Sequence, residues 1–123
     1  MEIQSTEQLF QDRCRPCEGQ TALYSAEQAR AQLAHLEEWY LVCAGQKIRR
    51  DFTAKNFLAG IAFFEKVARL AEIENHHPDL HLEGYRNLSL ELWTHTIGGL
   101  SVNDFILAAK INGLENPNGV VVE

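Results

Sequence analysis

The chain has 123 residues, of which 46% are hydrophobic, and a formal net charge of −6 at pH 7. This length fits one domain, and the hydrophobic content is too high for a disordered chain. The negative charge argues against sequence-independent binding of nucleic acid, which needs clustered Lys and Arg, and against an anionic membrane surface.

The first 22 residues are polar and lack periodicity, so they predict an N-terminal extension outside the folded domain. The extension contains Cys14 and Cys17 in a Cys-x2-Cys spacing. It carries no other residue of the pattern described below. We therefore expect it to be dispensable for chemistry, as we do the acidic C-terminal tail.

A capping box begins the domain, which we expect to span residues 23–112. Ser25 and Gln28 stand three residues apart and predict a helix over residues 26–37. Its apolar positions recur at spacings of four and three: Ala29, Leu33 and Leu36. Two short β-prone runs, residues 39–42 and 48–52, follow and predict a hairpin. Alternation in the second run is imperfect because Arg50 shares a face with Ile48 and Phe52.

The longest periodic stretch runs from Ala54 to about Asn75 and predicts an amphipathic helix. Its apolar stripe recurs every three or four residues: Phe57, Ile61, Phe64, Ala68 and Ala71. Pro78 disfavours helical conformation at His77, so we expect the helix to stop there.

A second hairpin is predicted after this helix. Leu80 and Leu82 alternate with polar residues, Glu83-Gly84 indicates a turn, and a second run alternates more cleanly. The apolar residues of that second run are Leu88, Leu90 and Leu92. Ser101 then caps a last helix, and residues 113–123, with Pro117 and Gly119, predict a tail that leaves the fold.

The order helix, strand, strand, helix, strand, strand, helix predicts an α+β fold. We expect one four-stranded antiparallel sheet with three helices packed on one face.

Residues suited to acid and base chemistry concentrate between positions 72 and 104. They are Glu72, His76-His77-Pro78, Tyr85, Thr94-His95-Thr96 and Asp104. Glu72 and His76 are four residues apart on the long helix, so Glu72 is expected to approach His76 and fix its tautomer. If the last strand reaches His95, alternation puts that side chain on the face of Glu91 and Trp93, opposite the leucines.

The spacing Glu-x3-His-His-Pro-x6-Tyr-x9-His-x8-Asp resembles the signature of the pterin-4a-carbinolamine dehydratase family, also called 4a-hydroxytetrahydrobiopterin dehydratases. With the upstream Cys-x2-Cys, the chain is similar to the longer form found in bacteria and plants. The resemblance covers about residues 14–112. It departs from the family pattern at Trp93, where a small hydroxylic residue is common.

The resemblance implies loss of water from a 4a-hydroxytetrahydropterin, without a cofactor, in tetrahydrobiopterin recycling. It implies His76 as base, His77 as the residue that orients the substrate and His95 as acid, although these roles could be exchanged. Histidine suits both proton transfers because its pKa lies near neutrality. The residues expected to bind substrate are Glu72, Asn75, Pro78, Trp93, Thr94 and Thr96, with Tyr85 and Asp104 in supporting positions.

Structural interpretations remain open for several of these residues. His-His-Pro alone often marks only the end of a helix, and Ser101 to Asp104 matches a capping box, which favours a structural role for Asp104. Tyr85 is expected to pack on the sheet, His35 to be solvated, and His81 to face away from Leu80 and Leu82.

A metal site is the less favoured alternative. His76, His77 and His81 with the Cys-x2-Cys pair offer ligands, but there is no second Cys-x2-Cys and no His-x3-His on a predicted helix. We therefore expect no metal.

A non-catalytic pterin-binding, assembly or dimerisation factor of the same fold, including one in molybdopterin metabolism, is the alternative function. Such factors tend to lose one or more of the three histidines, whereas this chain keeps all three.

The chain lacks a membrane-spanning apolar run and the basic, apolar start of a secretory signal, so we expect a cytoplasmic protein. Its three cysteines do not suggest a secreted disulfide framework. A domain this small leaves apolar surface uncovered, which predicts a homodimer or homotetramer.

Overall fold

The computed structural model describes residues 3–15, 23–114 and 120–122. The helices are α1 (Thr6–Gln11), α2 (Ala26–Leu33), α3 (Phe57–Glu74) and α4 (Val102–Asn112). The strands are β1 (Tyr40–Val42), β2 (Lys47–Ala54), β3 (Asp79–Glu83), β4 (Asn87–Leu92) and β5 (Val120–Val122). Short 3₁₀ helices occupy Cys43–Gly45 and His95–Ile97. In this described part of the chain, no helix is long and apolar enough to cross a membrane.

The strands form one antiparallel sheet in the order β1-β2-β4-β3. The predicted α+β class and four-stranded sheet are therefore confirmed. A fifth strand, β5, pairs with the end of β2 at Phe52 to Ala54. The prediction that the tail leaves the fold is wrong for residues 120–122, because three consecutive valines favour an extended strand. Pro117 and Gly119 lie outside the described residues.

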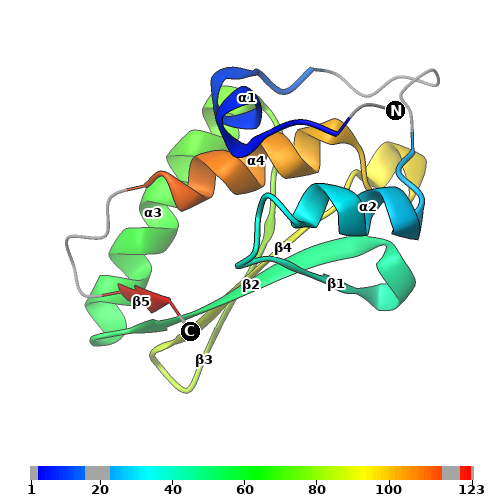
Figure 1. Ribbon diagram of the computed structural model, residues 1–123. Helices are drawn as coiled ribbons and strands as arrows, with labels where there is room; N and C mark the ends of the chain where they lie inside the picture. Colours follow the sequence, from blue (N-terminus) through cyan, green and yellow to red (C-terminus); the bar gives the residue numbers. More distant parts are fainter. Residues whose placement is uncertain (1–2, 16–22, 115–119, 123) are drawn as a thin grey trace.

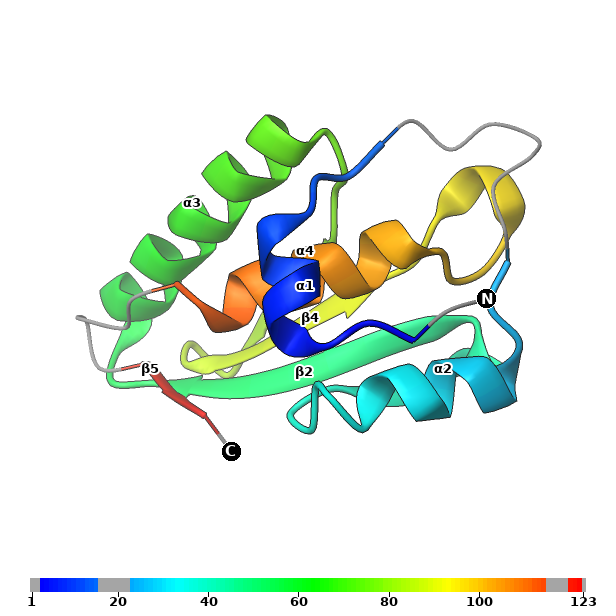
Figure 2. The same ribbon diagram turned by 45° about the horizontal axis from the view of Figure 1, so that its top comes forward.

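Three helices cover one face of the sheet, as predicted. Figure 1 shows α2, α3 and α4 above the strands, and Figure 2 shows α1 stacked on α4, on the side away from the sheet. Only the predicted number of helices is wrong, because α1 is a fourth α-helix among the described residues. Ser5 and Gln8 form its capping box, and Leu9 is its fully buried residue. A six-residue helix with one buried leucine has too few turns to show periodicity in the sequence.

The core lies between the sheet and α4. Alternation puts Ile48, Leu88, Leu90 and Leu92 on the covered face, where each is at most 2% exposed. Arg50 lies on this same face, with its guanidinium against Asn112 and over the Phe52 ring. The long stem of arginine explains how a charged residue fits the core pattern, since its head can reach the edge of the apolar layer.

Helix α3 ends earlier than the proline requires. Asn75 adopts the left-handed conformation, with φ 52° and ψ 42°, and the backbone N–H of His76 donates to the Ala71 carbonyl at 3.1 Å. This pairing is the Schellman ending of a helix. It stops α3 at Glu74, four residues before Pro78, and turns His76 and His77 away from the helix axis.

Candidate active site

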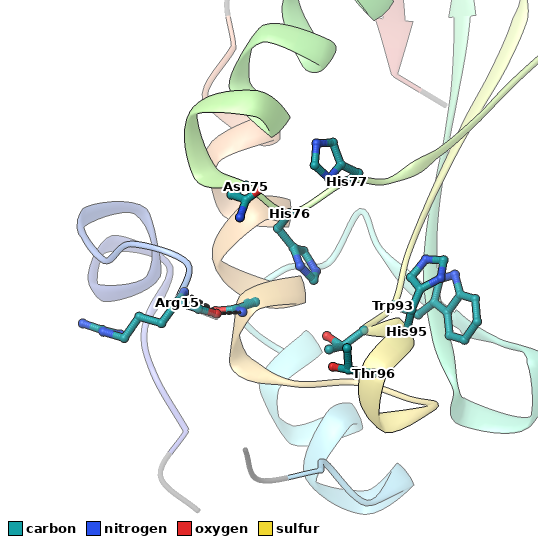
Figure 3. A pocket seen from close by; sticks show the side chains of 9 residues that line it. Arg15, Asn75, His76, His77, Trp93, His95 and Thr96 are labelled. Carbon is teal, nitrogen blue, oxygen red and sulfur yellow. Dashed lines mark hydrogen bonds between the residues drawn. The ribbon is translucent and has the colours of Figure 1, made fainter. Parts of the chain in front are cut away.

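The three histidines of the sequence pattern line one cavity of about 440 Å³. The cavity lies between the end of α3, the segment after β4 and the start of α4, and Figure 3 shows the three imidazoles around it. Seven residues singled out from the sequence line it: Asn75, His76, His77, Trp93, Thr94, His95 and Thr96. Two further lining residues, Arg15 and Asn103, were not expected.

His76 is held by a buried carboxylate. Its Nε2 lies 2.6 Å from Oδ1 of Asp104, a residue with no exposed surface. The second oxygen of Asp104 accepts from the Thr94 hydroxyl at 2.8 Å and from the backbone N–H of Ser101 at 3.0 Å. Asp104 therefore completes the predicted capping box of α4 and also orients His76. The capping box expected from the sequence accounts for one of these three contacts, the bond from the Ser101 N–H.

The expected pairing of Glu72 with His76 is wrong. Glu72 Oε2 lies 2.5 Å from Nε2 of His77 instead. The rule that residues four apart meet assumes an unbroken helix, whereas the left-handed Asn75 turns His76 toward Asp104. Both side chains of the Glu72–His77 pair are more than half exposed, so the pair adds little to stability.

His95 is placed by a turn, because β4 ends at Leu92, three residues before it. Backbone hydrogen bonds between Thr94 and Gly99 close a short loop around the 3₁₀ helix that begins at His95. Gly98 ends that helix with φ 65°, a conformation that glycine adopts without a steric cost. The His95 ring stacks on Trp93 with centroids 4.0 Å apart.

The N-terminal segment forms part of the cavity wall. The Asn103 side chain accepts from the N–H of Arg15 at 3.0 Å and donates to its carbonyl at 2.6 Å. Figure 3 shows the Arg15 guanidinium directed away from the histidines, so this residue contributes mainly its backbone to the wall. No sequence signal marked Arg15, whereas Asn103 could have been suspected from its place beside Asp104 in the first turn of α4.

The cysteine motif is only partly described. Burial and the nearby Glu74 carboxylate raise the pKa of Cys14 to about 12, so this residue is a neutral thiol near pH 7. Cys17 lies outside the described residues. Within residues 3–15, 23–114 and 120–122, no three His, Cys, Asp or Glu side chains are grouped as metal ligands would be.

Other candidates lie away from the cavity. Tyr85 is in the turn between β3 and β4 with φ 59° and is 59% exposed, so the expectation that it packs on the sheet is wrong. A tight turn, not a strand, governs its position. Pro78 leads from the cavity into β3, and His35 is exposed. His81 lies 3.6 Å from Glu91 on the uncovered face, opposite Leu80 and Leu82 as expected.

The chain matches the family model described as pterin 4 alpha carbinolamine dehydratase over residues 22–114. It is 46% identical over 110 residues to pterin-4-alpha-carbinolamine dehydratase 2, mitochondrial, from Arabidopsis thaliana, an alignment that covers 87% of this chain and 59% of that protein. It is 41% identical over 106 residues to a putative pterin-4-alpha-carbinolamine dehydratase from Methylococcus capsulatus, covering 86% and 92% of the two chains.

The fold has a solved counterpart. The crystal structure of a transcriptional coactivator/pterin dehydratase from Brucella melitensis superimposes with a TM-score of 0.68 at 27% identity. The superposition covers 75% of this chain and 97% of the other. Family model, relatives and fold therefore agree with one another.

Proposed function

The chain belongs to the pterin-4-alpha-carbinolamine dehydratase family and is a dehydratase of that class, and we propose that His76 and His95 carry out its proton transfers while His77 orients the substrate. The single observation that carries this proposal is that all three imidazoles line one cavity large enough for a bicyclic ligand.

The reaction requires two proton transfers. The substrate carries a hydroxyl group on C4a and a proton on N5. An acid protonates the hydroxyl so that the C4a–O bond breaks with loss of water. A base takes the N5 proton, and the electrons of the N5–H bond form the C4a=N5 bond of the quinonoid dihydropterin. Groups that titrate near neutrality do both tasks best.

His76 is the proposed base. When the N–H on Nε2 donates to Asp104, the lone pair on Nδ1 is free to accept the N5 proton. The buried carboxylate then stabilises the imidazolium that forms, as the aspartate of a catalytic triad does. His77, paired with exposed Glu72, is proposed to orient the substrate together with Asn75, Thr94 and Thr96.

His95 is the proposed acid toward the C4a hydroxyl. We expect His95→Ala to lower turnover of a chemically prepared 4a-hydroxytetrahydropterin by about 10²–10⁴, the range for loss of a positioned acid or base. The thermal midpoint should change little because the side chain is exposed. A His95→Ala enzyme with the wild-type rate would refute the three-histidine mechanism. If the wild-type protein itself showed no turnover, a non-catalytic pterin-binding role would replace the proposed dehydratase mechanism.

The pathway and compartment are part of the same proposal. We propose that the enzyme serves tetrahydrobiopterin recycling in the cytoplasm. The two cysteines in the described residues, Cys14 and Cys43, are free thiols, which fits a reducing compartment.

We further propose that the enzyme is a homodimer or homotetramer. Among the described strands, β3 pairs only with β4, so its outer edge offers unpaired backbone groups. Leu80 on that strand is 40% exposed, and Ile73 of α3 is 68% exposed. A second copy would cover the β3 edge and Leu80 by pairing the two β3 edges.

A further inference from the structure

The three histidines differ in what holds their rings. His76 and His77 each have a carboxylate within hydrogen-bond distance of Nε2. In the described part of the chain, the only partner of the His95 ring is the Trp93 indole, with centroids 4.0 Å apart and planes inclined by 30°. Among the described residues, neither nitrogen of the His95 ring therefore has a hydrogen-bond partner.

Trp93 is itself anchored from two neighbouring strands. Its Nε1–H donates to Asp79 Oδ2 on β3 at 3.2 Å. From β2, the Lys47 ammonium lies 4.9 Å from the indole centroid and 4.0 Å from Asp79. The β2–β4 register explains why Lys47 lies over Trp93. Ile48 pairs with Leu92, so Lys47 is the cross-strand neighbour of Trp93. The indole is thus a fixed surface, whereas His95 stands on a short turn.

We propose that Trp93 is the positioning residue for His95, an inference that rests on the proposed function of His95 as acid. Stacking fixes the plane of the imidazole but occupies neither ring nitrogen. One nitrogen can then donate to the leaving hydroxyl while the ring edge faces the cavity. A carboxylate partner would occupy one of those nitrogens, as it does at His76. Exposed histidine on a single turn would otherwise sample several rotamers.

The test is a double-mutant cycle measured with chemically prepared 4a-hydroxytetrahydropterin as substrate. Trp93→Leu should lower kcat by about 10- to 100-fold, the order expected for a misplaced catalytic group. Trp93→Phe keeps an aromatic face and should retain most of kcat. In the His95→Ala background, Trp93→Leu should lower kcat no further, because the group that it positions is gone.

The outcomes separate this inference from the proposed function. If the Trp93→Leu and His95→Ala effects on kcat multiply, or if Trp93→Leu raises only KM, Trp93 acts on the substrate directly and the inference is overturned. A wild-type rate for His95→Ala would instead overturn the proposed role of His95. Trp39→Phe is the matched control, since Trp39 is buried away from the cavity and bonds Asn112. It should leave kcat unchanged.

A second readout needs no substrate. The chain has two tryptophans, so Trp39→Phe leaves Trp93 as the sole indole fluorophore. A stacked imidazole quenches indole emission most strongly when the imidazole is protonated, so the emission is read in mildly acidic buffer. His95→Ala in that background should therefore raise the emission of Trp93, and unchanged emission would show that the stack does not form in solution.

Discussion

Asp104 serves two functions because its two carboxylate oxygens face different groups. Oδ2 accepts from the Ser101 N–H and the Thr94 hydroxyl at the start of α4, and Oδ1 meets His76. A charged group without exposed surface is tolerated only where its oxygens are satisfied in this way. The helix cap therefore fixes the position of His76, the proposed base, as well as the start of the helix.

Replacing Asp104 by Asn should separate these two functions. If the amide oxygen keeps the cap, the NH₂ group faces His76 and donates to Nε2, which moves the imidazole proton to Nδ1 and removes the lone pair that the base needs. We expect kcat to fall by about 10²–10⁴. Steady-state kinetics and a thermal melt on the same sample measure the two effects.

Ser25→Ala is the matched control for this substitution. Ser25 forms the same kind of capping box on α2, away from the cavity. Its loss should lower stability by about 1 kcal/mol and leave kcat unchanged. An Asp104→Asn enzyme with near wild-type kcat would contradict the role given to Asp104.

At the scale of elements, the N-terminal segment belongs to the domain. Leu9 is buried, and Gln32 of α2 exchanges two hydrogen bonds with the backbone of Gln4. At the other end of the segment, Glu74 of α3 accepts from the Cys14 N–H and from Lys110 of α4, both at 2.8 Å. The structure thus argues against a dispensable extension, since its removal would uncover α4 and one wall of the cavity.

Glu74 makes this attachment dependent on pH. Burial by itself would raise its pKa, but the bonds from Lys110 and the Cys14 backbone outweigh burial, and the pKa is lowered from its ordinary value of 4.5. A lowered pKa in the folded state means that ionised Glu74 stabilises the fold. That contribution is fully present above pH 4.5 and is lost as the pH falls through the lower folded value.

Glu74→Gln should therefore destabilise the protein by about 1.5–3 kcal/mol at pH 7, the range for hydrogen bonds to charged groups. The difference from wild type should shrink in denaturant titrations as the pH is lowered below 4.5. Glu65→Gln, which removes an exposed pair with Arg69, should change stability by less than about 0.5 kcal/mol. If the loss of stability in Glu74→Gln stays the same below pH 4.5, ionisation of Glu74 does not stabilise the fold and this prediction is wrong.

At the scale of the molecule, the two faces of the sheet differ. The helices cover one face, whereas the other carries a network in which Lys47 and Arg49 pair with Asp79, Glu91 and Asp51. A charged face of this kind resists apolar docking. The free edge of β3 and the apolar residues beside it are thus the better candidates for self-association.

Leu80→Lys should convert a dimer to a monomer in sedimentation velocity at micromolar concentration, because it places a charge on the pairing edge. Leu58→Lys is the control. Leu58 is 76% exposed on α3, so the substitution adds the same charge to an exposed apolar position of a helix instead of to the pairing strand. Wild-type protein that sediments as a monomer, or a dimer lost only in Leu58→Lys, would contradict pairing through β3.

The sequence by itself determined the family, the α+β class, four strands and the caps at Ser25 and Ser101, because these depend on local spacing and alternation. It also indicated the three histidines, since their spacing is a motif. Tertiary structure decided their partners. The left-handed conformation of Asn75 directs His76 toward Asp104 and leaves His77 to pair with Glu72. The 3₁₀ turn places the His95 ring against the Trp93 indole. Tertiary structure also brought Arg15 to the wall of the cavity, because contacts between residues 15 and 103 leave no periodic trace in either segment.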